Sequence, residues 1–88
     1  MRVILETNIL VSALISEHGV RAQLLNAWAD KAFILVTSAM QIAEFTAVTR
    51  RPLVRPLLTP ATVGRFINDL HRFATVLDQW PKQTLLVG

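Results

Sequence analysis

Two short apolar runs, at residues 3–5 and 33–36, constrain the fold of this 88-residue chain more than any other feature. Neither run alternates apolar with polar residues, so each predicts a strand that is covered on both faces. Apolar residues at helical spacing separate the two runs and resume after the second one. Covered strands joined by helical segments are typical of a parallel sheet, which places the chain in the α/β class.

The first helical segments lie between the two predicted strands. Thr7 or Asn8 is positioned to cap a helix that continues over residues 9–14. Helical spacing resumes at Val20 and reaches Trp28, so these two residues are predicted to share an inward face. We expect Trp28 to belong to the core.

Two further helices are predicted after the second strand. Ser38 and Gln41 form an S-x-x-Q capping box that begins a helix, and Pro52 limits how far this helix extends. Thr59, followed by a proline, marks the start of the last helix. The apolar face of that helix is predicted to extend as far as Leu77.

Apolar residues make up 52 % of the chain and charged residues 17 %, which is more apolar material than a small monomer easily buries. We therefore expect one domain at residues 1–78 and a tail at residues 79–88 that is exchanged between subunits of a homodimer or higher homo-oligomer. The tail holds Trp80 and an apolar run at residues 85–87, which together with Thr84 predicts another short strand. Two short strands alone would leave an unpaired edge, which the exchange would cover.

Cysteine is absent from the sequence, which favours a reducing compartment. No apolar run approaches the ~18–20 residues of a membrane span, and the first residues do not resemble a signal peptide. We expect a cytoplasmic protein with no membrane contact.

Charge is distributed unevenly along the chain, whose net charge is +3. Residues 1–44 carry three basic and four acidic side chains, whereas residues 45–88 carry six basic and two acidic ones. A basic second half attracts polyanions, so weak, non-specific contact with nucleic acid is predicted. The candidate phosphate-binding residues are Arg50, Arg51, Arg55, Arg65 and Arg72.

The opening of the chain, with Glu6-Thr7-Asn8 directly after the first apolar run, resembles the start of PIN domains. The likeness is greatest to the toxin components of toxin–antitoxin pairs. A capped helix that carries Glu44, followed by Arg51-Pro52, matches the family's later pattern in order and spacing. The resemblance implies a truncated PIN-like three-layer fold with a short parallel sheet flanked by about four helices, completed by oligomerisation.

The chemistry that the resemblance implies is cleavage of RNA by Mg²⁺ or Mn²⁺ held between carboxylates. Glu6 takes the family's first acidic position and Glu44 its second, while Thr7 or Asn8 would orient Glu6 or a water molecule. The family has Asp where this chain has Glu6, and its further acidic ligands come from a segment that would begin near the end of this chain. Asp69 and Asp78 do not match that pattern, so the resemblance implies a vestigial, incomplete site in which Glu6 and Glu44 would hold Mg²⁺ or Mn²⁺ only weakly.

Simpler explanations of the two glutamates stay open. Glu6 is also favoured by the positive end of a following helix. Glu44 has the apolar residues Met40 and Val48 one turn away on either side, which indicates the buried side of its helix, with a solvated edge as the alternative.

Three functions are compatible with these features. The first is a PIN-like nucleic-acid-binding protein whose ribonuclease activity is lost or vestigial. The second is an active metal-dependent ribonuclease, a toxin of a toxin–antitoxin pair, completed across a dimer. The third is an inert remnant or a protein-interaction module that binds an antitoxin-like partner.

Overall fold

The computed structural model describes residues 1–16, 18–78 and 85–87. Its strands and helices follow the order that the sequence predicts, with one additional strand, β3, before the strand predicted near the end. The elements are β1 (Arg2–Leu5), α1 (Thr7–Ile15), α2 (Val20–Ala29), β2 (Ile34–Ser38), α3 (Ala39–Thr49), α4 (Pro60–Phe73), β3 (Thr75–Leu77) and β4 (Leu85–Val87).

The strands form one parallel sheet in the order β3-β2-β1-β4. Val3 pairs with Leu35 of β2 on one side and with Leu85 of β4 on the other. The first predicted strand is covered, with Val3 to Leu5 of β1 buried. The second is covered in part: Leu35 and Val36 of β2 are buried, but Ile34 is 50 % exposed and Phe33 precedes the strand. The α/β class with a short parallel sheet and four helices is confirmed.

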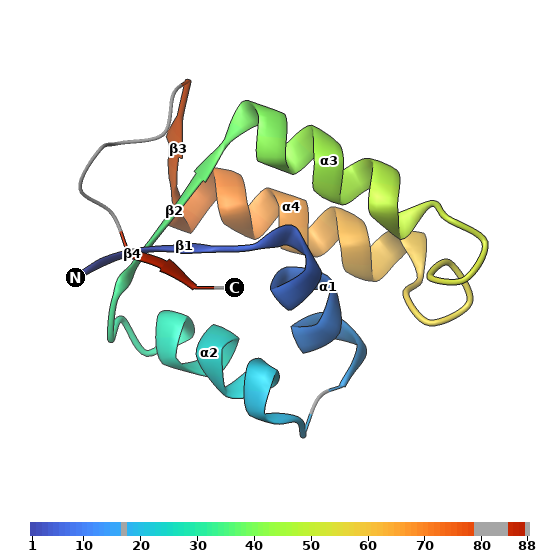
Figure 1. Ribbon diagram of the computed structural model, residues 1–88, viewed down its shortest axis with the longest axis horizontal. Helices are drawn as coiled ribbons and strands as arrows, with labels where there is room; N and C mark the ends of the chain where they lie inside the picture. The colour runs from blue at the N-terminus through green and yellow to red at the C-terminus, as the bar shows by residue number, and fades with distance from the viewer. Residues whose placement is uncertain (17, 79–84, 88) are drawn as a thin grey trace.

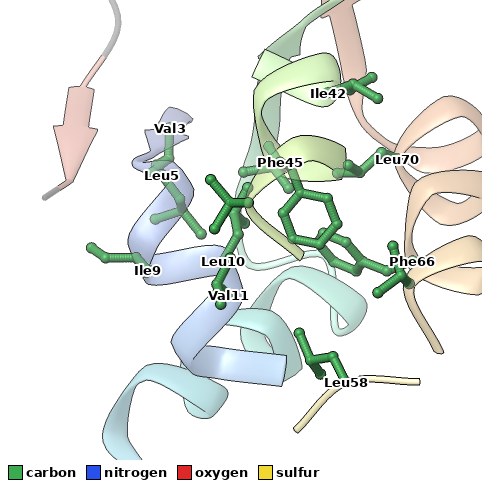
Figure 2. Close-up of a cluster of buried hydrophobic side chains, with 13 residues drawn as sticks. Val3, Leu5, Ile9, Leu10, Val11, Ile42, Phe45, Leu58, Phe66 and Leu70 are labelled. Carbon is green, nitrogen blue, oxygen red and sulfur yellow. The ribbon is translucent and has the colours of Figure 1, made fainter. Parts of the chain in front are cut away.

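The core lies among β1, β2 and the helices. Figure 1 shows α1 and α2 below β1, and α3 and α4 above it. Leu5 and Leu10 meet Phe45 of α3 and Phe66 of α4 in one apolar cluster (Figure 2). The rings of Phe45 and Phe66 are 5.3 Å apart between centroids. Trp28 is half-buried and packs against this cluster, edge-on to Phe66 at 6.3 Å, so it contacts the core but is not fully part of it as predicted.

The last helix is shorter than the apolar pattern predicted. Helix α4 ends at Phe73, and Thr75–Leu77 forms β3 beside β2. Phe73 is 64 % exposed, so it does not belong to the buried face of α4. Thr75 and Val76 are β-branched residues that favour extended backbone, and pairing with β2 overrides the helical spacing.

Helix caps are partly as predicted. Ser38 caps α3 by accepting from the Gln41 N–H at 3.0 Å, and Thr59 caps α4 in the same way. Neither Thr7 nor Asn8 caps α1, because Glu6 occupies the N-cap position and makes no side-chain cap hydrogen bond.

The prediction that Val20 faces inward was also wrong. Val20 is the first residue of α2, and its side chain is 80 % exposed.

The apolar run near the end of the sequence does include a strand, β4, which pairs with β1 of the same chain. Residues 79–84 and 88, with Trp80 among them, lie outside the described residues. Exchange of the tail between subunits therefore stays a prediction. Within the described residues, no helix is both long enough and apolar enough to cross a membrane.

Candidate functional site

Three of the predicted catalytic residues, Glu6, Thr7 and Asn8, follow the carboxyl end of β1, whereas Glu44 lies within α3. Glu6 directly follows β1, and continuing the β1–β2 register brings it level with Ser38 at the end of β2. Ser38 in turn pairs with Leu77 at the end of β3. Parallel strands bring their carboxyl ends to one edge, where the loops of α/β proteins commonly form binding sites. The fold therefore places Glu6 at the edge that the resemblance requires.

A buried hydrogen-bond network connects the carboxyl ends of β1 and β2 to α3. The Gln41 side-chain amide donates to the main-chain carbonyl of Leu5 at 2.7 Å. The Thr37 hydroxyl donates to Oε1 of Gln41 at 2.6 Å. Thr37 and Gln41 are both buried, so each hydrogen bond satisfies a group that water does not reach. Gln41 thus ties the last residue of β1 to β2 and to the first turn of α3.

This network changes the predicted capping box. Only half of the box forms, the hydrogen bond from the Gln41 N–H to Oγ of Ser38. The Gln41 side chain does not return to Ser38, because its amide nitrogen is used by Leu5 and its oxygen by Thr37. A residue that the sequence pattern assigned to a local cap therefore has a long-range role.

The three residues after β1 differ in exposure. Glu6 and Asn8 are exposed, whereas Thr7 is 7 % exposed at the first position of α1. As the N-cap of α1, Glu6 lies at the positive end of the helix dipole, which favours its negative charge. An exposed carboxylate at this position is free to contact solvent and ions.

Glu44 is exposed, and its placement on the buried side of α3 was wrong. The inner face of α3 is formed by Gln41, Phe45 and Val48, among others. Glu44 precedes Phe45 by one residue, so it lies about 100° around the helix from the centre of that face. Met40, the apolar neighbour that suggested burial, is itself 80 % exposed.

The fit of these residues to a divalent cation is poor. Among the described residues, no three His, Cys, Asp or Glu side chains come together as a metal-binding group. Mg²⁺ takes six oxygen ligands in near-octahedral geometry, and Glu6 and Glu44 supply carboxylates from two separate elements. The described residues therefore do not form a metal centre, and we assign no reaction step to one.

Asp78 is an acidic residue whose position the sequence pattern missed. It directly follows β3, so it lies at the same edge of the sheet as Glu6, with β2 between their strands. Neighbouring strands are ~4.8 Å apart, which separates the two backbones by roughly 10 Å. The β-branched pair Thr75-Val76, if interpreted as a strand, is the signal that would have identified Asp78.

The five predicted phosphate-binding arginines are all exposed, on α4 and around the connection from α3. Arg50 and Arg55 line one cavity of about 560 Å³ between the end of α3 and the start of α4. Arg72 lies over the ring of its neighbour Phe73, 5.1 Å from the centroid. The structure thus brings two of the five arginines together at one cavity.

A second cavity of about 560 Å³ lies near the start of β2 and has a different character. Its lining includes the aromatic side chains of Trp28, Phe33 and Phe73, with Lys31 and Asp69 as its charged members. Asp69 therefore lies at this cavity and not among the residues that follow the strands.

Comparison with known proteins gives one match, to the family of the PIN domain, whose model matches residues 2–84. No curated protein and no solved structure matches the chain.

Proposed function

Since this chain belongs to the PIN domain family, we propose that it binds nucleic acid weakly through the basic side chains of its second half, with the ribonuclease reaction lost or vestigial. PIN domains are a nuclease-like, nucleic-acid-binding family. The observation that carries the proposal is the exposure of all five arginines of the second half. Exposed arginines neutralise phosphates without regard to base sequence.

Loss of the nuclease reaction is the second part of the proposal. Glu6 and Glu44 are both exposed, and the described residues hold no group of three metal-binding side chains. Two carboxylates leave most of an octahedral shell to water, so Mg²⁺ or Mn²⁺ would bind weakly. Contacts between arginines and phosphates do not require such an ion. Nucleic-acid binding can therefore be retained when the ribonuclease reaction is lost.

One observation favours a second function, an active ribonuclease completed across a dimer. Asp78 lies at the same end of the sheet as Glu6, with β2 between their strands, so one chain brings two carboxylates to this end. A second chain that brought its own carboxylates to this edge would supply further ligands. This function requires cleavage of RNA that depends on Mg²⁺ or Mn²⁺ and stops with EDTA.

A filter-binding titration with duplex and single-stranded RNA tests the proposal. If four or five arginines neutralise phosphates, log affinity falls against log salt with a slope of about −4 for a duplex and about −3 for a single strand. Replacing Arg50 and Arg51 together by Ala is expected to weaken binding for every sequence and to reduce the slope. Arg21→Ala is the control, because Arg21 lies on α2 and donates to Ser12 instead.

Two outcomes would contradict the proposal. Absence of binding at low salt would leave the protein-interaction module as the remaining function. Its support is the exposure of Leu53, at 88 %, and of Leu57, at 59 %, between α3 and α4. Metal-dependent cleavage in the same samples would instead establish the active ribonuclease.

A further inference from the structure

We propose that the cavity between the end of α3 and the start of α4 binds a phosphate group through the side chains of Arg50 and Arg55. This inference rests on the proposed nucleic-acid binding. The cavity has a volume of about 560 Å³, which is ample for one phosphate group and the sugar attached to it. Its described lining includes two arginines and no carboxylate. Two positively charged side chains thus line one cavity whose described lining includes no negatively charged residue.

The position of Arg50 has a partial structural explanation, and that of Arg55 has none. Arg50 is the C-cap of α3, where the helix dipole favours a positive charge. Arg55 lies beyond this helix, in the connection to α4, where its N–H donates to the carbonyl of Arg51 at 2.9 Å. The dipole of α3 therefore explains a positive side chain at Arg50 but not one at Arg55. A bound anion would explain a positive side chain at both positions.

Three main-chain carbonyls near the end of α3 already have hydrogen-bond partners. The carbonyl of Thr46, which faces the end of α3, accepts from Oγ1 of Thr49 at 2.9 Å. The carbonyls of Ala47 and Val48 accept from the N–H groups of Arg50 and Arg51. These hydrogen bonds occupy carbonyl oxygens at the negative end of α3, and the guanidinium groups of Arg50 and Arg55 must outweigh the dipole that remains there.

The start of α4 adds little to recognition, so the arginines must supply it. Pro60 has no N–H, the N–H of Thr62 donates to Oγ1 of Thr59, and the N–H of Val63 donates to the carbonyl of Thr59. The arginine guanidinium group presents its N–H donors in a fork that matches the oxygens of a phosphate. Two such forks suit a phosphate group better than a singly charged carboxylate.

Gly64 keeps the cavity open from the side of α4. It lines the cavity, and a Cβ atom built on it would meet no heavy atom within 4 Å. The Cβ atom of a substituted residue therefore has open space at this position. This provides a way to alter the charge of the cavity while both arginines are kept.

The site is tested by titrating the ¹⁵N-labelled full chain with inorganic phosphate at constant ionic strength and following the amide signals by NMR. We expect saturable shifts for residues that line the cavity, including Gly64. The double variant Arg50→Gln, Arg55→Gln is expected to weaken phosphate binding by at least about tenfold. Arg21→Gln, which removes a charge from α2, is expected to leave phosphate affinity within about twofold.

Substitution of Gly64 provides a test that retains both arginines. Gly64→Glu places a carboxylate at the cavity and is expected to weaken phosphate binding about tenfold, whereas the neutral Gly64→Gln of similar size is expected to change it much less. Equal affinity in the Glu and Gln variants, or unchanged affinity in the double arginine variant, would overturn the site.

Short RNA with and without a 5′-phosphate separates a terminal phosphate from an internal one. A cavity for the terminal group predicts tighter binding of the 5′-phosphorylated RNA, with the advantage lost in Arg50→Gln, Arg55→Gln. A cavity for an internal phosphodiester predicts equal binding of both RNAs and an equal loss in that variant.

If inorganic phosphate binds at the cavity but neither RNA binds the protein, the proposed nucleic-acid binding is wrong and the phosphate site is retained. If the variant binds both RNAs as the wild type does, the phosphate site fails and the function stands.

Discussion

The side-chain amide of Gln41 donates a 2.7 Å hydrogen bond to the main-chain carbonyl of Leu5, a residue 36 positions earlier in the chain. Leu5 is the last residue of β1, and Glu6 follows it directly. The same Gln41 oxygen accepts from the Thr37 hydroxyl on β2. One buried amide therefore sets the position of Glu6 relative to β2 and α3, and with it the shape of the carboxyl edge of the sheet.

Replacing Gln41 by Leu is expected to lower the free energy of unfolding by about 2–3 kcal/mol, because it leaves the Leu5 carbonyl and the Thr37 hydroxyl buried without partners. Thr37→Val, which orphans only Oε1 of Gln41, is expected to cost about 1–2 kcal/mol. Urea denaturation followed by circular dichroism measures both values. The exposed Gln23→Leu on α2 is the control, expected within about 0.5 kcal/mol of wild type. A Gln41→Leu protein as stable as this control would show that the network contributes nothing.

Gly64→Ala is expected to raise the free energy of unfolding by about 0.5–1 kcal/mol. Gly64 lies inside α4, where alanine is the better helix former, and its new Cβ would meet no atom within 4 Å. Gly19→Ala is the contrast, since a Cβ there would approach Oγ of Ser16 to 2.9 Å, so no gain is expected. Thermal melts of the two variants decide the matter. A loss of stability in Gly64→Ala would mean that the space beside α4 is filled.

Millimolar Mg²⁺ is expected to change Tm by less than about 2–3 °C relative to EDTA. A ligand present at no more than its Kd stabilises by at most about 0.4 kcal/mol, which corresponds to that shift for a domain of this size. Differential scanning fluorimetry with wild type and Glu44→Ala provides the measurement. A rise on the order of 5 °C or more that disappears in Glu44→Ala would establish a metal site that includes Glu44.

Sedimentation equilibrium at micromolar concentration is expected to show a homodimer, with twice the 9.8 kDa mass of one chain. The reason is the apolar surface that one chain leaves in water: Met40 is 80 % exposed, Leu53 88 % and Phe73 64 %. Burial of such side chains against a second chain is favourable and stabilises the dimer. A folded monomer under these conditions would contradict the expectation.

Deleting residues 79–88 is expected to cause aggregation or unfolding. The deletion removes β4, which covers one edge of β1, and an exposed edge beside an apolar strand recruits other chains. Size-exclusion chromatography and circular dichroism report the outcome. A soluble dimer that survives the deletion would place the subunit interface elsewhere, away from the tail.

Features that depend on neighbouring residues could be predicted from the sequence. The strands at β1 and β2 were identified because uninterrupted apolar runs predict covered strands. The starts of α3 and α4 were identified because Ser38 and Thr59 cap residues only three positions away. The end of α4 was missed because pairing with β2, far away in the sequence, decides whether Thr75 is helical or extended.

The sequence by itself thus determined the α/β class, the first strands, the starts of α3 and α4 and the uneven charge, since each rests on contacts within a few residues or on composition. Tertiary structure alone decided that Gln41 reaches Leu5 and that Arg50 and Arg55 share a cavity. It also decided that Glu44 faces solvent. These relationships depend on how strands pair and helices pack across tens of residues, and no local pattern of residue types encodes that arrangement.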